Sequence, residues 1–117
     1  MNKISIIFVC TGNICRSPTA EVIFKSKIEG MGLTDFFLVD SAGTHGYHIG
    51  QSPDQRSVSA AKPYNYSFEG IKSRAFDVSI DYENDYIIAM DQSHLNWLMD
   101  NKPSECSSKI DLLMNFD

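Results

Sequence analysis

The stretch KISIIFVCTGNICRSP, residues 3–18, contains a strand pattern that leads directly into a loop and then into the start of a helix. Residues 3–9 form a short run rich in β-branched side chains, which is typical of a strand covered on both faces. Ser17 is a residue type that caps helices, and Pro18 suits the first helical position. The stretch therefore predicts a strand–loop–helix unit with Cys10 at the carboxyl end of the strand, where open α/β sheets bind ligands.

The rest of the chain repeats this alternation of strand and helix patterns. Short apolar runs predict three more strands, and apolar residues at helical spacing or behind cap residues predict three helices. The predicted strands cover residues 36–40, 85–90 and 109–114, and the predicted helices cover residues 17–31, residues 54–62 and a segment behind the cap candidates Asp91 and Ser93. This order predicts a three-layer α/β fold, with a parallel sheet, right-handed crossovers and helices on both faces, in which residues 1–117 form one domain.

Composition and charge exclude several classes of partner. The 117 residues are 43% hydrophobic, and the formal net charge is -5. An acidic chain offers no general basic surface to nucleic acid or anionic lipid, so we expect neither as a partner. No apolar run approaches the length of a membrane span, and no export signal is recognisable. Three cysteines do not make a disulfide framework, so we expect a cytoplasmic protein.

The loop after Cys10 has the composition of a phosphate site. Backbone N–H groups of residues 11–15 can point inward as an anion nest, and the helix N-terminus adds partial positive charge. Arg16 carries a planar fork that binds two phosphate oxygens at once. The same donors, together with the Ser17 hydroxyl, favour the thiolate form of Cys10. One set of groups can therefore hold a nucleophile and bind its target.

The same cysteines allow three other interpretations. A lone cysteine after a buried strand is more often a small core residue. Cys10, Cys15, His45 and His48 are all zinc-ligand types, but the gap between the two cysteines is wide and Arg16 would repel the metal. A redox pair normally has two intervening residues rather than four. We therefore expect no metal and no cofactor.

The sequence resembles the low-molecular-weight protein tyrosine phosphatases over its whole length. The resemblance is carried by VCTGNICRSPTAE at residues 9–21, VDSAGTHGYHIGQSPDQR at 39–56, DYIIAMDQSHL at 85–95 and KIDLLMNFD at 109–117. It implies a four-stranded parallel sheet in the order 2-1-3-4. It also implies hydrolysis of phosphotyrosine, in a protein or a small aryl phosphate, through a cysteinyl-phosphate formed in a C-x5-R loop without metal.

The resemblance also implies a role for each matching residue. Cys10 would be the nucleophile, and Arg16 would bind the phosphate and the transition state. Asn13 would buttress the loop, Ser17 would support the thiolate, and Tyr47 would line the slot for the substrate ring. Cys15 would bond Cys10 reversibly as a redox partner and shield it from irreversible oxidation. The backbone cradle of the phosphate would come from Thr11, Gly12, Asn13, Ile14 and Cys15.

Three residues bear on the choice among activities. Ile14 favours phosphotyrosine, since phosphoarginine phosphatases of this family carry threonine there. A thiol-coupled arsenate reductase is an alternative, but Pro18 and the single downstream cysteine, Cys106, count against it. A phosphate-binding module that traps phosphoproteins without efficient turnover is another alternative.

The chain departs from the family pattern at two places. Ile71 matches the position at which the family usually has a histidine bonded to the loop asparagine. The sequence therefore does not show which residue would hold Asn13 in place. The family's general acid belongs to an Asp-Pro pair after the fourth strand, and residues 1–117 contain no such pair. Asp117 is only a weak candidate for the acid. We therefore expect a phosphatase domain truncated at its C-terminus, with slow turnover and with an exposed sheet face that favours self-association.

Overall fold

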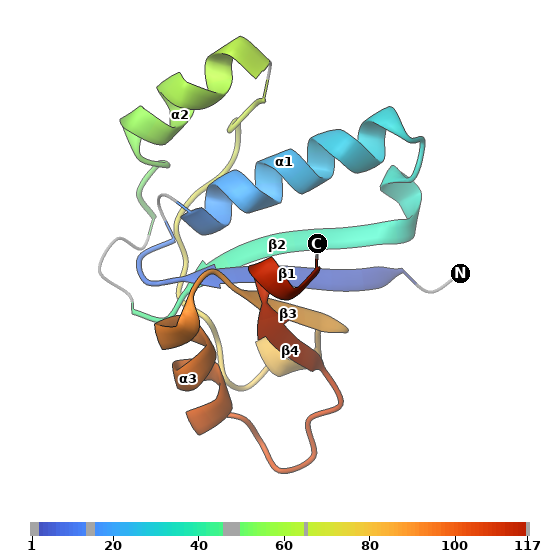
Figure 1. The fold of residues 1–117 in the computed structure, drawn as a ribbon, viewed down its shortest axis with the longest axis vertical. Helices are drawn as coiled ribbons and strands as arrows, with labels where there is room; N and C mark the ends of the chain where they lie inside the picture. Colours follow the sequence, from blue (N-terminus) through green and yellow to red (C-terminus); the bar gives the residue numbers. More distant parts are fainter. Residues whose placement is uncertain (1–2, 14–15, 46–49, 65, 117) are drawn as a thin grey trace.

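The computed structural model describes residues 3–13, 16–45, 50–64 and 66–116, and these residues form alternating strands and helices (Figure 1). The strands are β1 (Ile4–Cys10), β2 (Phe37–Gly43), β3 (Tyr86–Ala89) and β4 (Lys109–Leu112). The α-helices are α1 (Arg16–Gly30), α2 (Gln55–Ala61) and α3 (Gln92–Asp100). Short 3-10 helices are η1 (Thr34–Phe36), η2 (Lys62–Tyr64), η3 (Asp81–Glu83) and η4 (Leu113–Phe116).

The four strands form one parallel sheet in the order β2-β1-β3-β4, which confirms the predicted fold class. Strand β1 pairs with β2 over its full length, so that Cys10 lies opposite Gly43 at the carboxyl end. The loop after β1, the segment after β2 and the start of α3 meet at this end of the sheet (Figure 1). Parallel α/β sheets bind ligands at this edge.

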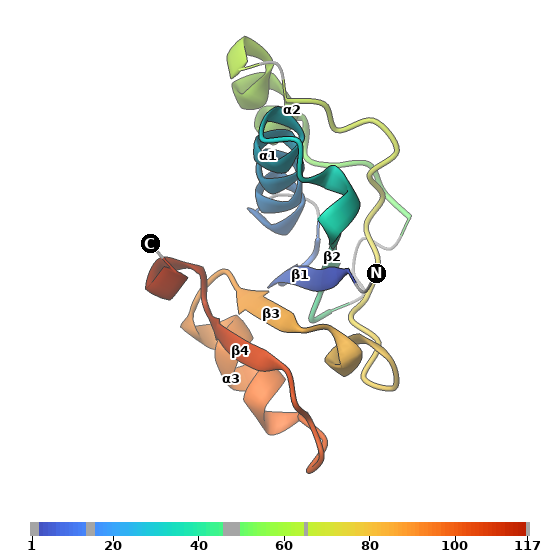
Figure 2. The ribbon, with the colours of Figure 1, turned by 90° about the vertical axis from the view of Figure 1, so that its right-hand side faces the viewer.

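Helices cover both faces of the sheet, as predicted (Figure 2). Side chains of β1 alternate between the faces because a strand has a period of two residues. Ile7 and Val9 point into a core shared with Leu98 of α3. Ile6 and Phe8 point to the opposite face, which α1 covers. Helix α2 packs on α1 through a smaller cluster of apolar side chains, Val22, Val58, Ala61 and Phe68 among them.

Three predicted boundaries differ most from the structure. Strand β4 ends at Leu112, two residues before the predicted end at Met114, because the chain turns into the 3-10 helix η4 at Leu113. Helix α1 begins at Arg16, two residues before Pro18, the predicted first helical position, so Ser17 lies within the first turn and does not cap the helix. The physical reason is that the Ser17 hydroxyl is engaged with Cys10 across the loop. Strand β2 continues to Gly43, three residues beyond the predicted end at Asp40, because its pairing with β1 extends to Cys10.

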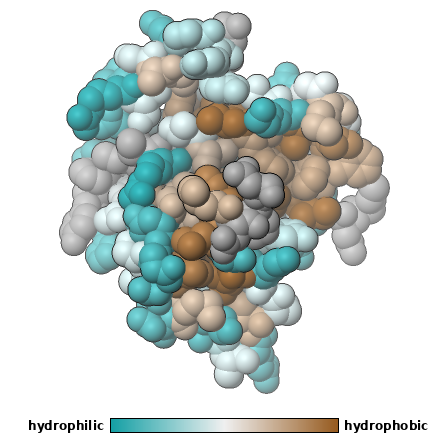
Figure 3. All heavy atoms as spheres, in the orientation of Figure 1, coloured by the Kyte–Doolittle hydropathy of each residue, from teal (hydrophilic) through white to brown (hydrophobic). Residues whose placement is uncertain are grey.

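Apolar side chains remain accessible along α1 and the sheet face beside it. Two grooves of about 670 and 620 Å³ adjoin there and share Ala20, Ile23 and Leu113. Figure 3 shows hydrophobic side chains gathered on this side of the molecule. Arg16 lines one of the two grooves, which therefore reaches the start of α1. In the part of the chain that the structure describes, no helix has the length and apolar character needed to cross a membrane.

Candidate active site

The Cys10 sulfur is buried at the end of β1 and is surrounded by hydrogen-bond donors. The Ser17 Oγ lies 2.9 Å from the Cys10 Sγ, and the backbone N–H of Asn13 donates to the same sulfur over 3.3 Å. The Asn13 N–H comes from the loop, and the Ser17 hydroxyl comes from the first turn of α1, where the helix dipole is positive. Both groups can donate a hydrogen bond to a negatively charged sulfur.

Asn13 determines the direction of the hydrogen bond between Ser17 and Cys10. Its buried side chain accepts the backbone N–H of Arg74 at Oδ1 over 2.9 Å, which turns the amide nitrogen toward Ser17. The Asn13 Nδ2 donates to the Ser17 Oγ over 2.9 Å. Because the serine oxygen accepts this bond, its own hydrogen can be donated, and the acceptors in reach are the Cys10 sulfur at 2.9 Å and the Ala42 carbonyl at 3.5 Å. Asn13 has φ 56°, in the left-handed region that asparagine tolerates better than most residues.

The segment after η2 supports the loop from outside. The Ser73 hydroxyl donates to the carbonyl of Gly12 over 2.7 Å, directly before Asn13. Ile71, which the alignment set at the position of the family's histidine, packs instead against Val22 and Phe68. The support of Asn13 that the sequence left open therefore comes from Ser73 and from the backbone of Arg74.

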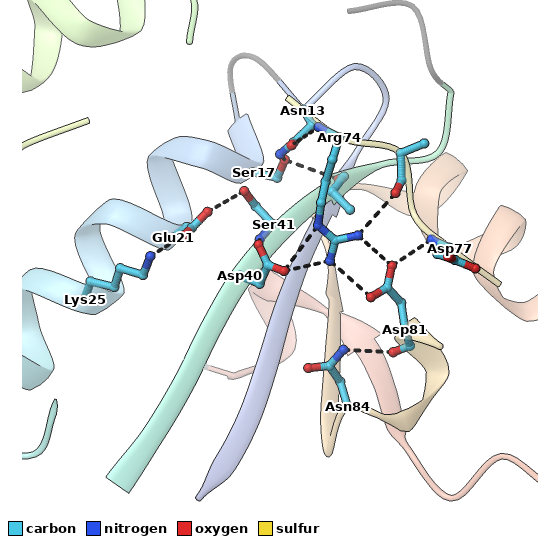
Figure 4. A network of polar contacts seen from close by, with 12 residues as sticks. Asn13, Ser17, Glu21, Lys25, Asp40, Ser41, Arg74, Asp77, Asp81 and Asn84 are labelled. Carbon is cyan, nitrogen blue, oxygen red and sulfur yellow. Dashed lines mark hydrogen bonds and ion pairs between the residues drawn. The ribbon is translucent and has the colours of Figure 1, made fainter. Parts of the chain in front are cut away.

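The Arg74 side chain holds this supporting segment against the sheet (Figure 4). Its guanidinium bonds Asp40 of β2 over 2.7 Å and Asp81 of η3 over 2.8 Å. Burial opposes the charge, but the hydrogen bonds that Arg74 donates to Asp81 and Asp40 outweigh it and raise the pKa of Arg74 above its ordinary value. These two ion pairs also hold the Arg74 backbone N–H, which orients the Asn13 side chain.

Arg16 is paired with Asp91, which caps α3. The Arg16 Nη1 lies 2.9 Å from the Asp91 Oδ2, and the two side chains are 53% and 41% exposed. The other carboxylate oxygen accepts the backbone N–H groups of Ser93 and His94. The hydrogen bond from the Ser93 hydroxyl, together with that from Arg16, holds the pKa of Asp91 well below its usual range. A charged carboxylate thus faces the guanidinium at the mouth of the loop.

His94 links α3 to the loop, and it was not among the site residues predicted from the sequence. Its Nε2 lies 2.9 Å from the Thr11 Oγ1, and its Nδ1 accepts the backbone N–H of Asp91 over 3.2 Å. The signal in the sequence was the spacing of Asp91 and His94, which places a second capping side chain three residues after the first. The contact with Thr11 had no local signal, since it joins residues that are far apart in the chain.

The structure brings the described members of the predicted loop together. Cys10, Thr11, Gly12, Asn13, Arg16 and Ser17 all lie between the end of β1 and the first turn of α1. The remaining predicted site residues, Ile14, Cys15, Tyr47 and Asp117, lie outside the described residues. Within the described residues, no group of three or more histidine, cysteine or acidic side chains is arranged to hold a metal ion.

Comparisons with known proteins point to one family. The family described as "Low molecular weight phosphotyrosine protein phosphatase" matches residues 5–117. A Saccharomyces cerevisiae protein of that name is 44% identical in an alignment of 113 residues that covers 92% of this chain and 67% of the relative. A crystal structure of YfkJ from Bacillus subtilis is 37% identical with a TM-score of 0.93, and covers 99% of this chain and 73% of its own. A protein tyrosine phosphatase from Entamoeba histolytica, solved with Hepes in its active site, is 40% identical with a TM-score of 0.90, over 97% of this chain and 72% of its own.

Proposed function

Because the chain belongs to the low-molecular-weight phosphotyrosine protein phosphatase family, we propose that it hydrolyses phosphotyrosine through a cysteinyl-phosphate formed on Cys10. The observation that carries the proposal is the environment of the Cys10 sulfur. It stands at the carboxyl end of β1, 2.9 Å from the Ser17 hydroxyl and within reach of the Asn13 N–H. These donors suit a thiolate that attacks an electrophile held at the start of α1.

In the first step the Cys10 thiolate attacks phosphorus, an S–P bond forms, and the P–O bond to the tyrosine ring breaks. The electron pair leaves on the phenolic oxygen, which takes a proton from the solvent. In the second step water attacks phosphorus and gives up a proton to the solvent, the S–P bond breaks with its electron pair on sulfur, and inorganic phosphate and the thiolate are released. The Ser17 hydroxyl donates to the sulfur in its negatively charged form, before the first step and after the second.

Arg16 binds the phosphoryl oxygens in this proposal. Its guanidinium already lies at the mouth of the loop, where Asp91 holds it over 2.9 Å. In the transition state the charge spreads over three equatorial oxygens, and a planar fork can follow it with two parallel hydrogen bonds. Asp91 therefore prepares the position of Arg16 before the substrate arrives.

The substrates we propose are tyrosine-phosphorylated proteins or small aryl phosphates. Residues 1–117 contain no Asp-Pro pair, and we assign no general acid among them. A positioned acid contributes about 10²- to 10⁴-fold when the leaving group is strongly basic. Aryl phosphates with weakly basic leaving groups should therefore be the best substrates of this polypeptide. Because Cys10 must stay reduced, we propose a reducing compartment such as the cytoplasm.

We also propose that the two adjoining grooves along α1 associate with the same face of a second copy. Both are lined mainly by apolar side chains, and the largest exposed apolar surfaces of small proteins are often interaction sites.

Release of inorganic phosphate from a phosphotyrosine peptide, with and without a metal chelator, tests the proposed reaction. We expect turnover that the chelator leaves unchanged. Cys10→Ser should abolish turnover and still bind vanadate. Hydrolysis by Cys10→Ser at a rate near that of the wild type, or loss of turnover in chelator alone, would contradict the proposal.

A further inference from the structure

The hydrogen bonds of His94 determine which ring nitrogen carries its proton. The side chain is 2% exposed. Its Nδ1 accepts the backbone N–H of Asp91 over 3.2 Å, and a neutral imidazole has one donor and one acceptor. The proton of the neutral ring therefore lies on Nε2, which donates to the Thr11 hydroxyl over 2.9 Å.

This bond in turn sets the role of the Thr11 hydroxyl. An oxygen that accepts from His94 keeps its own hydrogen for another acceptor. Thr11 is exposed, directly follows Cys10, and has its backbone carbonyl fixed by the N–H of His45 over 3.0 Å. The hydroxyl is thus a donor at the rim of the phosphate loop, and its direction is controlled from α3.

We propose that His94 is a positioning residue that turns the Thr11 hydroxyl toward an oxygen of the bound phosphate ester, and that acid disrupts this arrangement. The inference rests on the proposed function, because it assigns a further donor to the same phosphate loop. It makes Thr11 a side-chain ligand of the substrate in addition to its place in the backbone cradle.

Protonation of His94 would remove the acceptor that holds the ring. A proton on Nδ1 would face the backbone N–H of Asp91, so this contact must break. The charged groups that act on the ring are the Asp91 carboxylate, 3.3 Å from Nδ1, and beyond it Arg16 and His45. A charged ring would compete with Arg16 for Asp91. Burial lowers the pKa of His94 and, helped by Arg16 and His45, outweighs the attraction of Asp91. The neutral, correctly oriented ring is therefore the form present at neutral pH.

Two substitutions separate the contacts of His94. In His94→Asn the side-chain oxygen can replace Nδ1 and cap Asp91, but the side chain is too short to reach Thr11. In His94→Gln the amide nitrogen can replace Nε2 and donate to Thr11. We expect Thr11→Val and His94→Asn each to lower kcat/KM for an aryl phosphate by about threefold to tenfold, the range of one lost hydrogen bond. His94→Gln should restore part of that loss.

The double variant and the pH profile provide the decisive readouts. Thr11→Val combined with His94→Asn should have a kcat/KM no lower than that of either single variant, since both changes remove the same contact.

The ratio of kcat/KM between wild type and His94→Gln should fall as the pH decreases, because only the wild type has a titrating ring at this position. Ionisation of the substrate is the same for both proteins and cancels in the ratio. Asn96→Ala, on the exposed side of α3, is the matched control. The inference would be overturned if the double variant lost as much kcat/KM as the two single losses multiplied together. It would also be overturned if the ratio of kcat/KM between wild type and His94→Gln did not depend on pH.

Two further measurements need no turnover. Nitrogen NMR of the ring should find Nε2 protonated and Nδ1 bare at neutral pH, and Thr11→Val should shift the Nε2 signal. Inorganic phosphate should bind less tightly to Thr11→Val than to wild type, with no further loss in the double variant. Failure of turnover alongside these results would count against the proposed function and still support the inference. A proton on Nδ1 of the neutral ring, or equal phosphate affinity in Thr11→Val, would overturn it.

Discussion

At the scale of single residues, Gly43 shows how closely the neighbouring strand approaches the phosphate loop. A Cβ at this position would lie 2.5 Å from the carbonyl oxygen of Thr11 and 3.1 Å from the nitrogen of Asn13. Both neighbours are backbone atoms, so the loop itself would have to move. We expect Gly43→Ala to lower kcat/KM by about tenfold to a hundredfold, since small displacements of a catalytic group are costly.

Gly30→Ala is the matched control for this change, because a Cβ there would meet nothing within 4 Å. The measurement is kcat/KM for one aryl phosphate in the three proteins, with the urea midpoint as a check of folding. Equal activity in Gly43→Ala and wild type would show that the loop tolerates displacement, and would contradict the role given to Gly43.

Arg16 allows a test of geometry against charge. Arg16→Lys keeps the positive charge and loses the planar fork, so it can no longer bind two phosphoryl oxygens in parallel. We expect kcat to fall by on the order of a hundredfold or more. The exposed Arg56 offers a control in Arg56→Lys. Activity of Arg16→Lys close to that of the wild type would show that plain charge is sufficient.

Some residues of the site could be predicted from the sequence, and others become apparent only in the folded structure. Cys10, Arg16 and Ser17 stand in one continuous stretch, and the strand and helix on either side fix their positions. A local pattern was therefore sufficient to select them. Ser73 and His94 reach the loop only through the folded sheet and helices, 61 and 83 residues away from their partners. No local pattern encodes such contacts, and from the sequence Ile71, rather than Ser73, stood at the position expected to support the loop.

At the scale of elements, the start of α3 couples the fold to pH through His94. Burial is the main reason why the pKa of His94 lies below its usual value of 6.5. The unfolded chain therefore binds this proton at a higher pH than the folded chain does. The free energy of unfolding should be highest above pH 6.5, decrease as the pH falls through that value, and stop changing from this cause below the lowered pKa.

Urea denaturation at several pH values between 7.5 and 4.5, a range chosen around the usual pKa of histidine of about 6.5, measures this dependence. His94→Gln should remove the His94 share of the slope, whereas Asn96→Ala, at an exposed position of the same helix, should leave that share in place. An identical slope in wild type and His94→Gln would show that the buried ring does not contribute.

The elements themselves were predictable because their patterns are strong. The four strands are short and apolar, and the cap at Asp91 matches the observed capping box. The start of α1 was less certain, since the preference of Ser17 for a cap position competes with its contact to Cys10. The end of β2 was missed because Ser41 and Gly43 are poor strand formers, and tertiary pairing with β1 overrides that preference.

At the scale of the whole molecule, the grooves along α1 predict self-association. The chain spans 67% to 73% of the length of the relatives to which we compared it. Ile23 lines both grooves, so Ile23→Glu places a charge in the middle of the apolar surface. We expect the wild type to dimerise as its concentration rises in sedimentation experiments, and Ile23→Glu to stay monomeric. A wild type that is monomeric at every concentration tested would contradict the prediction.

The most direct test of the account is to trap the phosphorylated enzyme. The protein is mixed with an aryl phosphate, quenched in acid within one turnover and digested with trypsin. Because Lys3 and Arg16 flank the loop, one peptide carries both Cys10 and Cys15, and fragmentation within it separates the two positions. We expect a phosphoryl group on Cys10 in the wild type and none in Cys10→Ser. Turnover without any phosphoryl group on Cys10, or with the group on Cys15, would contradict it.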